Sequence, residues 1–331
     1  MFGRILVVGG NSFSGAYFSA EMVSRGRNVL AISRSERPEN MFLPENWAYP
    51  KNTNVPFMQL DLNTQQKELH EVIHDFKPDL VVNFAAQGMV AESWANPVDW
   101  YKTNVLAQIH LHDILRECQS LKRYVHVTTP EVYGSSTGWV KENNFFQPST
   151  PYAASRAACD LHLLTYFRGH DFPVIFTRSA NVYGSGQQLY RIIPRAIVAA
   201  LTGQKLELHG GGLSERAFVH IKDVVDATYK VATDGKLGGC YHISTNEIVS
   251  ISEVVEKVAS IFGLKKEDIC ELGTERLGKD HSYMLDSSKI RNELNWSEKI
   301  SLDDGILDVK SWVEKNLDTI NLMSLAYKHK V

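Results

Sequence analysis

The stretch VVGGNSFSG, residues 7–15, decides the fold because it combines an apolar run, a glycine turn and the first turn of a helix. Gly9 and Gly15 stand six residues apart, and the middle small position is Ser12. Such a turn lets a pyrophosphate approach the unpaired N–H groups of a helix N-terminus. For the two glycines alone, an ordinary strand-to-helix turn is the alternative. The predicted pyrophosphate contacts are Gly9, Ser12, Phe13, Ser14 and Gly15.

Outward from this turn, the first half of the chain alternates short apolar runs with longer amphipathic segments. The apolar runs are RILVV, NVLAIS, VPFMQLDL, LVVNFAA, YVHVTT and VIFTRSA. Buried runs of this length between helical segments indicate parallel strands joined by crossover helices. The sequence therefore predicts an α/β fold with a Rossmann-like doubly wound parallel sheet.

After Asn181 this alternation weakens into short predicted strands and helices, which suggests a smaller second α/β lobe interleaved with the first. We expect residues 1–180 plus about 218–240 to form the dinucleotide-binding domain. Residues from about 181–217 plus 241–331 are then expected to form the substrate-binding lobe. A cleft between the two lobes is the expected ligand site.

Composition limits the classes of partner. The 331 residues include 35 Lys or Arg and 38 Asp or Glu, for a net charge of −3, and the charges are well mixed. This balance suggests neither a nucleic-acid groove nor a membrane-binding face, so small molecules are the expected partners. The apolar run near the N-terminus is too short for a signal peptide or membrane span, and a cytoplasmic location is expected.

The cysteine spacing suits neither a zinc site nor a disulfide framework, so we predict reduced thiols and no metal. The four cysteines are Cys118, Cys159, Cys240 and Cys270.

Residues at the ends of the predicted strands indicate the cofactor. Ser33 and Arg34 follow the second strand, where a dinucleotide site meets the adenosine ribose, and their hydroxyl and cation suit a 2′-phosphate. They favour NADP and leave NAD open; the alternative is a solvated arginine in a charged loop. Asp61 is placed to accept from an adenine amino group, or else is a plain turn carboxylate. The other predicted cofactor contacts are Leu62, Ala85 and Ala86, although the two alanines would also suit packing.

Two segments suggest the chemistry. In VTTPEVYG, residues 127–134, Glu131 directly follows Pro130, and the neighbouring residues leave open whether it transfers protons or shapes a turn. In STPYAASR, residues 149–156, Tyr152 and Arg156 are four apart and share one helix face. A tyrosine base near neutrality needs its pKa lowered by roughly three units, about 4 kcal/mol. A cation 5 Å away supplies about 3 kcal/mol of this.

Several motifs taken in order resemble the extended short-chain dehydrogenase/reductase family, particularly its nucleotide-sugar 4,6-dehydratases. They are the glycine turn, NFAAQ, TNVLA (Thr103 to Ala107), TTPEVYG and PYAASR, followed by TRSANVYGSGQ, RIIP and GQKLELHGGGLSERAFVHIKDV. The likeness spans nearly the whole chain.

The resemblance implies a role for each matching residue. Thr129 would hydrogen-bond the sugar O4, Tyr152 would remove the 4-hydroxyl proton, and hydride would pass to a tightly bound NAD(P). Glu131 would then remove the C5 proton and help to expel the 6-hydroxyl as water. The family pattern also implies Arg156 as the cation that holds the nicotinamide ribose. The residues it places on the nucleotide-diphosphate sugar are Gln87, Asn181, Arg216 and Arg276.

Two positions depart from the family pattern and keep alternatives open. Pro130 replaces the aspartic acid that protonates the departing hydroxyl in thymidine-diphosphoglucose dehydratases, and Arg156 replaces a lysine. A nucleotide-sugar epimerase or 4-dehydrogenase is therefore the second hypothesis. A catalytically silent cofactor-binding homologue, suggested by Ser12 and Arg156, is the third.

The resemblance also predicts a homodimer. The segments Val98 to Glu117 and Tyr152 to Phe167 resemble the helices that pair across the family's dimer as a four-helix bundle.

Overall fold

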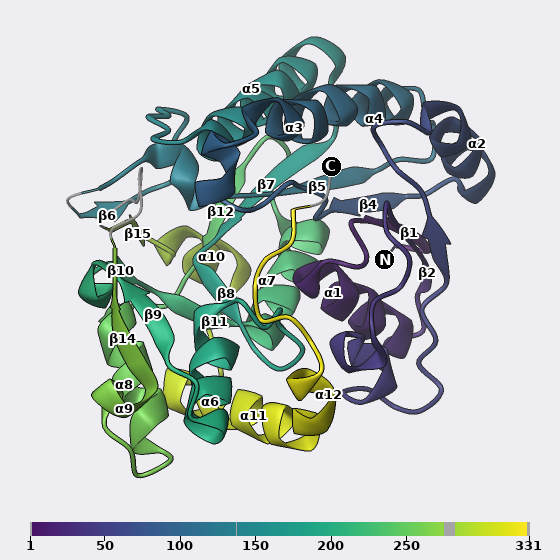
Figure 1. Ribbon diagram of the computed structural model, residues 1–331. Coiled ribbons are helices and arrows are strands. Elements are labelled where there is room, and N and C mark those ends of the chain that lie inside the picture. Colours follow the sequence, from purple (N-terminus) through teal and green to yellow (C-terminus); the bar gives the residue numbers. More distant parts are fainter. Residues whose placement is uncertain (1, 137, 275–281, 330–331) are drawn as a thin grey trace.

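Seven parallel strands form the central sheet, in the order β12-β7-β5-β4-β1-β2-β3. The computed structural model describes residues 2–136, 138–274 and 282–329 (Figure 1). The strands are β1 (Arg4–Val8), β2 (Asn28–Ser33), β3 (Phe57–Gln59), β4 (Leu80–Asn83), β5 (Arg123–Thr128), β7 (Val174–Ser179) and β12 (Cys240–Ile243). The predicted Rossmann-like doubly wound parallel sheet is confirmed.

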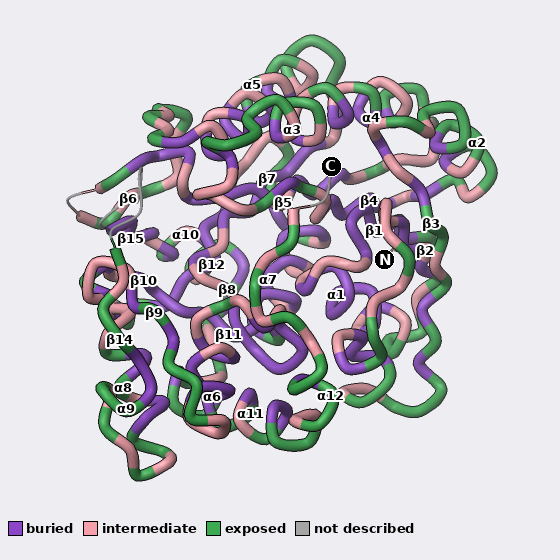
Figure 2. The backbone as a smooth tube through the Cα atoms, in the orientation of Figure 1, coloured by how far each residue is buried: buried purple, intermediate pink, exposed green. Residues whose placement is uncertain are grey.

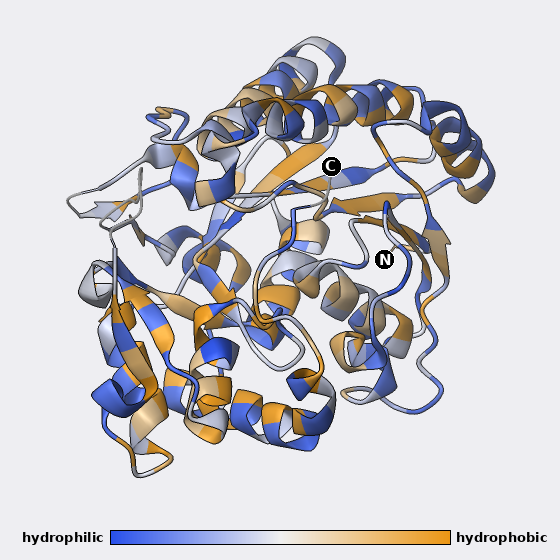
Figure 3. Ribbon diagram, in the orientation of Figure 1, coloured by the Kyte–Doolittle hydropathy of each residue, from blue (hydrophilic) through white to orange (hydrophobic). Residues whose placement is uncertain are grey.

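Helices cover both faces of this sheet, as the apolar runs require. One face carries α1 (Phe13–Ser24) and α7 (Ile221–Asp234); the other carries α2 (Gln66–Phe76), α4 (Ala107–Arg116) and α5 (Pro151–His170). Figure 3 shows the hydrophobic strands between these layers, and Figure 2 shows the burial of the strands and the exposure of the outer helix surfaces.

The last strand of the sheet corrects one predicted boundary. β12 pairs in parallel with β7, with Cys240 opposite Phe176 and Ile243 opposite Ser179. Residues 241–243, which the sequence analysis assigned to the second lobe, therefore belong to the central sheet. The apolar run CYHI is short and lies far along the chain from the other strands, so local pattern gave no reason to join it to them. The remainder of the proposed domain division stays a prediction.

The second lobe consists of short paired strands and helices around its own apolar core. Its strand pairs are β8 (Asn181–Tyr183) with β11 (Phe218–His220), β9 (Leu206–His209) with β14 (Cys270–Gly273), and β10 (Glu215–Arg216) with β13 (Val249–Ser250). Its helices are α6 (Ile192–Thr202), α8 (Ile251–Ser260), α9 (Lys266–Ile269), α11 (Leu302–Lys315) and α12 (Leu317–Asn321), whereas α10 (Ser288–Leu294) packs against β12 and α7 of the central sheet layer. A further parallel pair joins β6 (Trp139–Val140) to β15 (Met284–Leu285).

Contacts across the two lobes interlock them. The Tyr17 hydroxyl on α1 donates to the Ser185 carbonyl at 2.8 Å. The Trp312 indole on α11 donates to the Met41 carbonyl at 3.2 Å. Within the described residues, no helix has the length and apolar character needed to cross a membrane.

The segment between β4 and α4 contains a widened helical turn. After α3 (Pro97–Tyr101), residues Lys102–Leu106 form a π-helical turn before α4 begins. Such turns recur at functional sites because they redirect side chains out of the regular helical register. Here the turn contains Thr103 to Leu106 of the TNVLA motif, and its Asn104 accepts a hydrogen bond from the Gln87 N–H in the loop after β4.

Candidate active site

A pocket lies at the carboxyl ends of β1, β2 and β4, where the strand order reverses and ligands of such sheets bind. It brings together these predicted cofactor residues: Gly9, Ser12, Ser33, Arg34, Asp61, Leu62, Ala85 and Ala86. The structure thus gathers the dispersed strand-end residues into one site.

The glycine turn has the geometry of a pyrophosphate cradle. Gly9 has φ +82°, and a Cβ there would come within 2.6 Å of the Ala85 nitrogen. Ser12 caps α1: its hydroxyl donates to the Gly9 carbonyl at 2.7 Å and accepts from the Gly15 N–H at 3.1 Å. The cap leaves the first-turn N–H groups of Phe13 and Ser14 available to an anion. Serine at the middle position therefore fits a dinucleotide.

Arg34, which lines the pocket, is hydrogen-bonded to Gln87. The Arg34 Nη2 donates to the Gln87 Oε1 at 2.9 Å, and the Gln87 Nε2 lies 3.1 Å from the His329 Nδ1. His329 stacks on Trp100 with ring centroids 5.1 Å apart and pairs with Asp99 at 2.9 Å. The C-terminal segment, which runs in Figure 1 from α12 towards the ends of the central strands, therefore contacts the predicted substrate residue Gln87.

Asp61 fits both interpretations made from the sequence. It lines the pocket, and its Oδ1 also accepts from the Asn63 backbone N–H at 2.9 Å, as a turn carboxylate does.

Thr129, Pro130 and Glu131 form the turn directly after β5. Thr129 is the N-cap of a short 3₁₀ helix, Pro130–Tyr133, and its hydroxyl accepts from the Glu131 N–H at 3.4 Å. Pro130 occupies the first helical position, where its fixed φ and missing N–H are tolerated. Pro130 therefore has a backbone role that sets the direction in which Glu131 leaves the strand.

Tyr152 lies in the first turn of α5, next to that strand end. Thr150 caps the helix by accepting from the Ala153 N–H at 3.2 Å, and Pro151 takes the first position as predicted. The Thr129 hydroxyl hydrogen-bonds the Tyr152 side chain, and Glu131 is close enough to affect it electrostatically. The structure thus brings the predicted catalytic residues Thr129, Glu131 and Tyr152 together.

The pKa of Tyr152 is raised to about 12, so the Arg156 charge alone does not bring it near neutrality in this structure. Burial is the largest cause, and the charge of Glu131 adds to it. The charges of Arg156 and Arg191 and the hydrogen bond from Thr129 lower the pKa without overcoming burial. The simple Coulomb argument omitted desolvation, which disfavours the tyrosinate.

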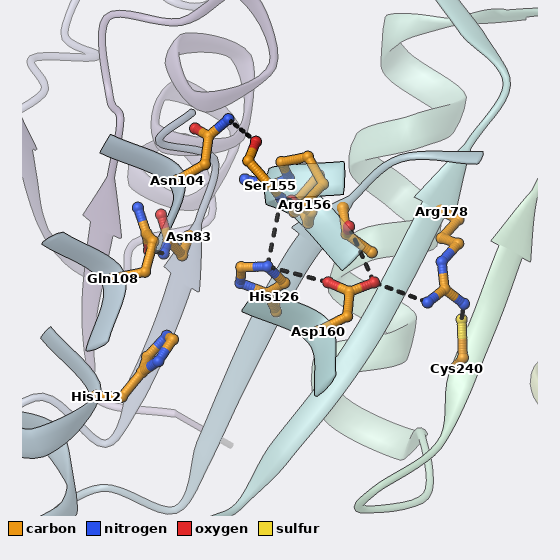
Figure 4. A network of polar contacts seen from close by, with 12 residues as sticks. Asn83, Asn104, Gln108, His112, His126, Ser155, Arg156, Asp160, Arg178 and Cys240 are labelled. Carbon is orange, nitrogen blue, oxygen red and sulfur yellow. Dashed lines mark hydrogen bonds and ion pairs between the residues drawn. The ribbon is translucent and has the colours of Figure 1, made fainter. Parts of the chain in front are cut away.

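Arg156 turns towards the sheet in a buried polar network (Figure 4). Its Nη2 donates to the Val127 carbonyl at 2.5 Å and lies 3.3 Å from the His126 Nε2. Among the described residues, its Nε and Nη1 have no hydrogen-bond partner although both are buried. Arg156 is not among the residues that line the pocket, and its predicted contact with the nicotinamide ribose stays a prediction.

Three buried side chains beside Arg156, namely His112, His126 and Cys159, have potential metal-ligand atoms within 4.8 Å of one another. We assign no metal to them, because the Tyr124 hydroxyl bonds His112 at 2.9 Å and the Arg156 guanidinium would repel a cation.

In the second lobe, Tyr283 joins two predicted substrate residues. Its hydroxyl donates to the Asn181 Oδ1 at 3.0 Å, and the Arg216 guanidinium stacks 4.3 Å from its ring centroid. Arg276, the fourth predicted substrate residue, lies outside the described residues.

Sequence reasoning missed several residues of the site. Thr103 and Asn63 line the pocket, and Arg191 acts on the Tyr152 side chain. Asn104 accepts from the Gln87 N–H at 2.7 Å and donates to the Ser155 hydroxyl at 3.0 Å. The TNVLA motif contained a signal for Thr103 and Asn104, but its residues had no assigned role.

The doubly wound sheet, the glycine turn after its first strand and a tyrosine four residues before a cation define a short-chain dehydrogenase/reductase of the extended type. Within that class, the chain belongs to the GDP-mannose 4,6 dehydratase family, whose model it matches over residues 6–309.

Individual relatives agree with this placement. The chain is 31% identical to the dTDP-D-glucose 4,6-dehydratase of Mus musculus, over 95% of this chain and 89% of that protein. It is also 31% identical to the trifunctional UDP-glucose 4,6-dehydratase/UDP-4-keto-6-deoxy-D-glucose 3,5-epimerase/UDP-4-keto-L-rhamnose-reductase of Arabidopsis thaliana, over 80% of this chain. It spans only 40% of that protein's length.

A solved structure gives the same result. The dTDP-glucose 4,6-dehydratase from Streptomyces venezuelae, determined with NAD bound, superposes with a TM-score of 0.87 at 28% identity. The match covers 96% of this chain and 98% of that one. The predicted family and the predicted class of enzyme, an NAD(P)-dependent nucleotide-sugar enzyme, are confirmed.

Proposed function

We propose that this chain is a nucleotide-sugar 4,6-dehydratase that works through a 4-keto intermediate. The observation that supports the proposal most is the meeting of Thr129, Glu131 and Tyr152 at the carboxyl end of β5. Epimerisation and 4-oxidation need only the Thr129 hydroxyl and the Tyr152 phenol. Dehydration also needs a base that removes the C5 proton, and Glu131 lies where such a base is required. The dTDP-glucose and GDP-mannose dehydratase relationships agree with this reaction.

The first half-reaction uses Tyr152 and Thr129. Thr129 holds the sugar O4, and the Tyr152 oxygen takes the 4-hydroxyl proton. A bound NAD(P) would supply the acceptor for the C4 hydride and the donor of that hydride to C6. Because Tyr152 must be ionised to act, the cationic Arg156 and Arg191 assist this step by lowering its pKa.

The second half-reaction uses Glu131. A 4-ketone acidifies the C5 proton, and the Glu131 carboxylate removes it. With Pro130 unable to donate a proton, Glu131 also returns the proton to the departing 6-hydroxyl, which leaves as water. One carboxyl group thus serves as base and then as acid; C5 regains a proton from solvent as hydride returns to C6, and Tyr152 releases the O4 proton to solvent, so the proton balance closes.

An epimerase or 4-dehydrogenase is the second candidate, favoured by Pro130 because no acidic side chain stands at that position. The backbone role of Pro130 as the first residue of the 3₁₀ helix weakens this candidate, since it explains the proline without a change of reaction.

Arg34 supports NADP as the cofactor. It lies at the end of β2 on the rim of the pocket, where a 2′-phosphate would meet its guanidinium. The Arg34 guanidinium is held by the Gln87 contact at 2.9 Å. Extraction of the cofactor from purified protein, followed by mass spectrometry, decides between NADP and NAD.

The reaction is tested with Glu131→Gln. Wild-type protein incubated separately with GDP-mannose, dTDP-glucose and UDP-glucose should convert one of them to a product lighter by one water. Glu131→Gln should still reduce the nicotinamide but should lose both water elimination and solvent-deuterium exchange at C5. An unchanged mass with altered NMR couplings would instead identify an epimerase, and a loss of two hydrogens a dehydrogenase.

The predicted homodimer has support from exposed apolar residues on α3, the π-helical turn and α5. Val98, Leu106 and Leu161 are 60%, 56% and 48% exposed, which is unusual for aliphatic side chains clustered on packed helices. Leu106→Glu should convert a dimer into a monomer in sedimentation velocity. Leu322→Glu, at a 90% exposed site on the C-terminal segment, should leave the dimer intact.

The cytoplasmic location stays a prediction.

A further inference from the structure

His126 lies between a cation and an anion beneath helix α5. Its Nε2 is 3.3 Å from the Arg156 Nη2 and 3.4 Å from the Asp160 Oδ1. All three side chains are at most 2% exposed, and Figure 4 shows the imidazole of β5 between the two side chains of α5.

The imidazole is held in its neutral form. Burial lowers the pKa of His126 well below its usual value, and the charges of Arg156 and Arg178 lower it further. A protonated imidazole would place a third cation against the single carboxylate of Asp160. The 3.3 Å contact with the Arg156 Nη2 is a hydrogen bond in the tautomer whose Nε2 carries the lone pair, and in that tautomer the Nδ1–H faces the Tyr124 hydroxyl at 3.4 Å.

Asp160 is held in place by hydrogen bonds to its second carboxylate oxygen. Its Oδ2 accepts from the Arg178 Nη2 at 2.8 Å and from the Thr128 hydroxyl at 3.2 Å. Arg178 in turn contacts Tyr133 at 2.8 Å. The network extends across β5 and β7 and gives His126 a rigid setting.

The contacts of Arg156 divide its guanidinium into two parts. The Nη2 is used by the Val127 carbonyl and His126, whereas the Nε and Nη1 are buried without a partner among the described residues. Of the two buried cations of this network, Arg156 and Arg178, only the Arg156 charge is among the influences on Tyr152, whose pKa it lowers against the opposing charge of Glu131. A tyrosinate would balance the Arg156 charge.

We propose that His126 is a positioning residue for Arg156, and that its neutral imidazole fixes the guanidinium so that the cation stabilises the ionised Tyr152. The effect on activity rests on the proposed function, in which Tyr152 is the base. The contact between His126 and Arg156 does not depend on that function, and it can be measured in protein without added ligand.

The contact is tested first by NMR of ¹⁵N-arginine-labelled, ligand-free protein. A guanidinium held through Nη2 rotates slowly about its Cζ–Nε bond, so Arg156 should show separate Nη signals, which are told apart from those of the buried Arg178 by their loss in Arg156→Lys. Because the Val127 carbonyl still holds Nη2 in His126→Leu, that variant should speed the rotation and broaden the Arg156 signals, whereas His126→Gln, which keeps an acceptor, should leave them sharp. Averaged Arg156 signals in the wild-type protein would overturn the proposal.

Activity is tested with a matched control in the same core. His112 is equally buried and bonds the Tyr124 hydroxyl, but in the described structure it has no hydrogen bond to Arg156. His126→Leu should lower kcat at neutral pH about tenfold, the effect of one pKa unit on Tyr152, with unchanged KM for the sugar nucleotide. It should also shift the acid limb of the kcat profile upwards, and His126→Gln should restore both.

His112→Leu should leave kcat and its pH profile unchanged. Equal profiles for His126→Leu and His112→Leu would contradict the proposal. If His126→Leu does not fold, His126→Asn replaces it, because the shorter amide does not reach Arg156. Wild-type protein that is inactive on every sugar nucleotide refutes the proposed function, while the NMR signals still decide the contact.

Discussion

At the scale of single residues, Tyr152 is subject to opposing influences, of which burial is the largest. Burial and the Glu131 carboxylate raise its pKa to about 12, while Arg156, Arg191 and the Thr129 hydroxyl lower it. The tyrosine acts as a base only when ionised, so activity falls as pH falls through its pKa. A bound cofactor with a positive pyridinium ring would add to the lowering influences. The balance between desolvation and neighbouring cations therefore sets the pH range of the enzyme.

Arg156→Gln removes one of these cations and should shift the acid limb of the kcat profile upwards. The expected shift is about one to two pH units, from the Coulomb interaction at an effective dielectric near 20. Arg156→Lys keeps the charge and should shift the limb less. The measurement is kcat against pH for the three proteins, with thermal melting to show equal folding. An unshifted acid limb in Arg156→Gln would show that Arg156 does not act on the base.

At the scale of elements, the π-helical turn Lys102–Leu106 connects the site to the helical layer. Its Asn104 is fully buried, accepts from the Gln87 N–H and donates to the Gln87 carbonyl and the Ser155 hydroxyl. One side chain thus joins the end of β4 to α5. The loop that begins at Gln87 has no regular ladder to satisfy these backbone groups.

Asn104→Leu should leave the Gln87 N–H and carbonyl buried without partners. Each such group costs about 1–3 kcal/mol, so the free energy of unfolding should fall by an amount in that range or above it. Urea denaturation measures the change. Asn96→Leu, at an exposed position before α3, is the control and should change the free energy little. An unchanged free energy of unfolding in Asn104→Leu would contradict this account of the turn, whatever the effect of Asn96→Leu.

The elements also show which parts of the structure a sequence can predict. The strands and the glycine turn follow from local patterns, because apolar runs and small residues act within a few positions of one another. The partners of Arg216 and Gln87 do not: Tyr283 and His329 lie 67 and 242 residues away along the chain, and only the folded lobes bring them close. The raised pKa of Tyr152 was unpredictable for the same reason, since desolvation depends on the complete packing.

At the scale of the whole molecule, several histidines are buried in a neutral state. Burial is the main cause that lowers the pKa of His112 and His126 well below the usual value and that of His242 to about 3. Unfolded histidines titrate near pH 6.5, so below that pH the unfolded chain binds protons that the folded protein excludes. Stability is therefore complete above about pH 6.5 and is lost as pH falls towards the folded pKa values.

The free energy of unfolding should fall by about 1.4 kcal/mol per pH unit for each such histidine below pH 6.5. Urea denaturation between about pH 7 and 5 measures the slope. His242→Gln should make the slope shallower by the share of one histidine, and His110→Gln, at an exposed position, should leave it unchanged. A stability independent of pH over this range would refute the neutral burial of these side chains.

The central claim is that the Tyr152 oxygen takes the proton of the sugar 4-hydroxyl. The most direct measurement is the single-turnover rate of nicotinamide reduction by Tyr152→Phe, compared with Tyr166→Phe on the same helix, whose hydroxyl bonds Asp113 instead. The account predicts a fall of about 10²- to 10⁴-fold for Tyr152→Phe and a wild-type rate for Tyr166→Phe. A wild-type rate in Tyr152→Phe would contradict it.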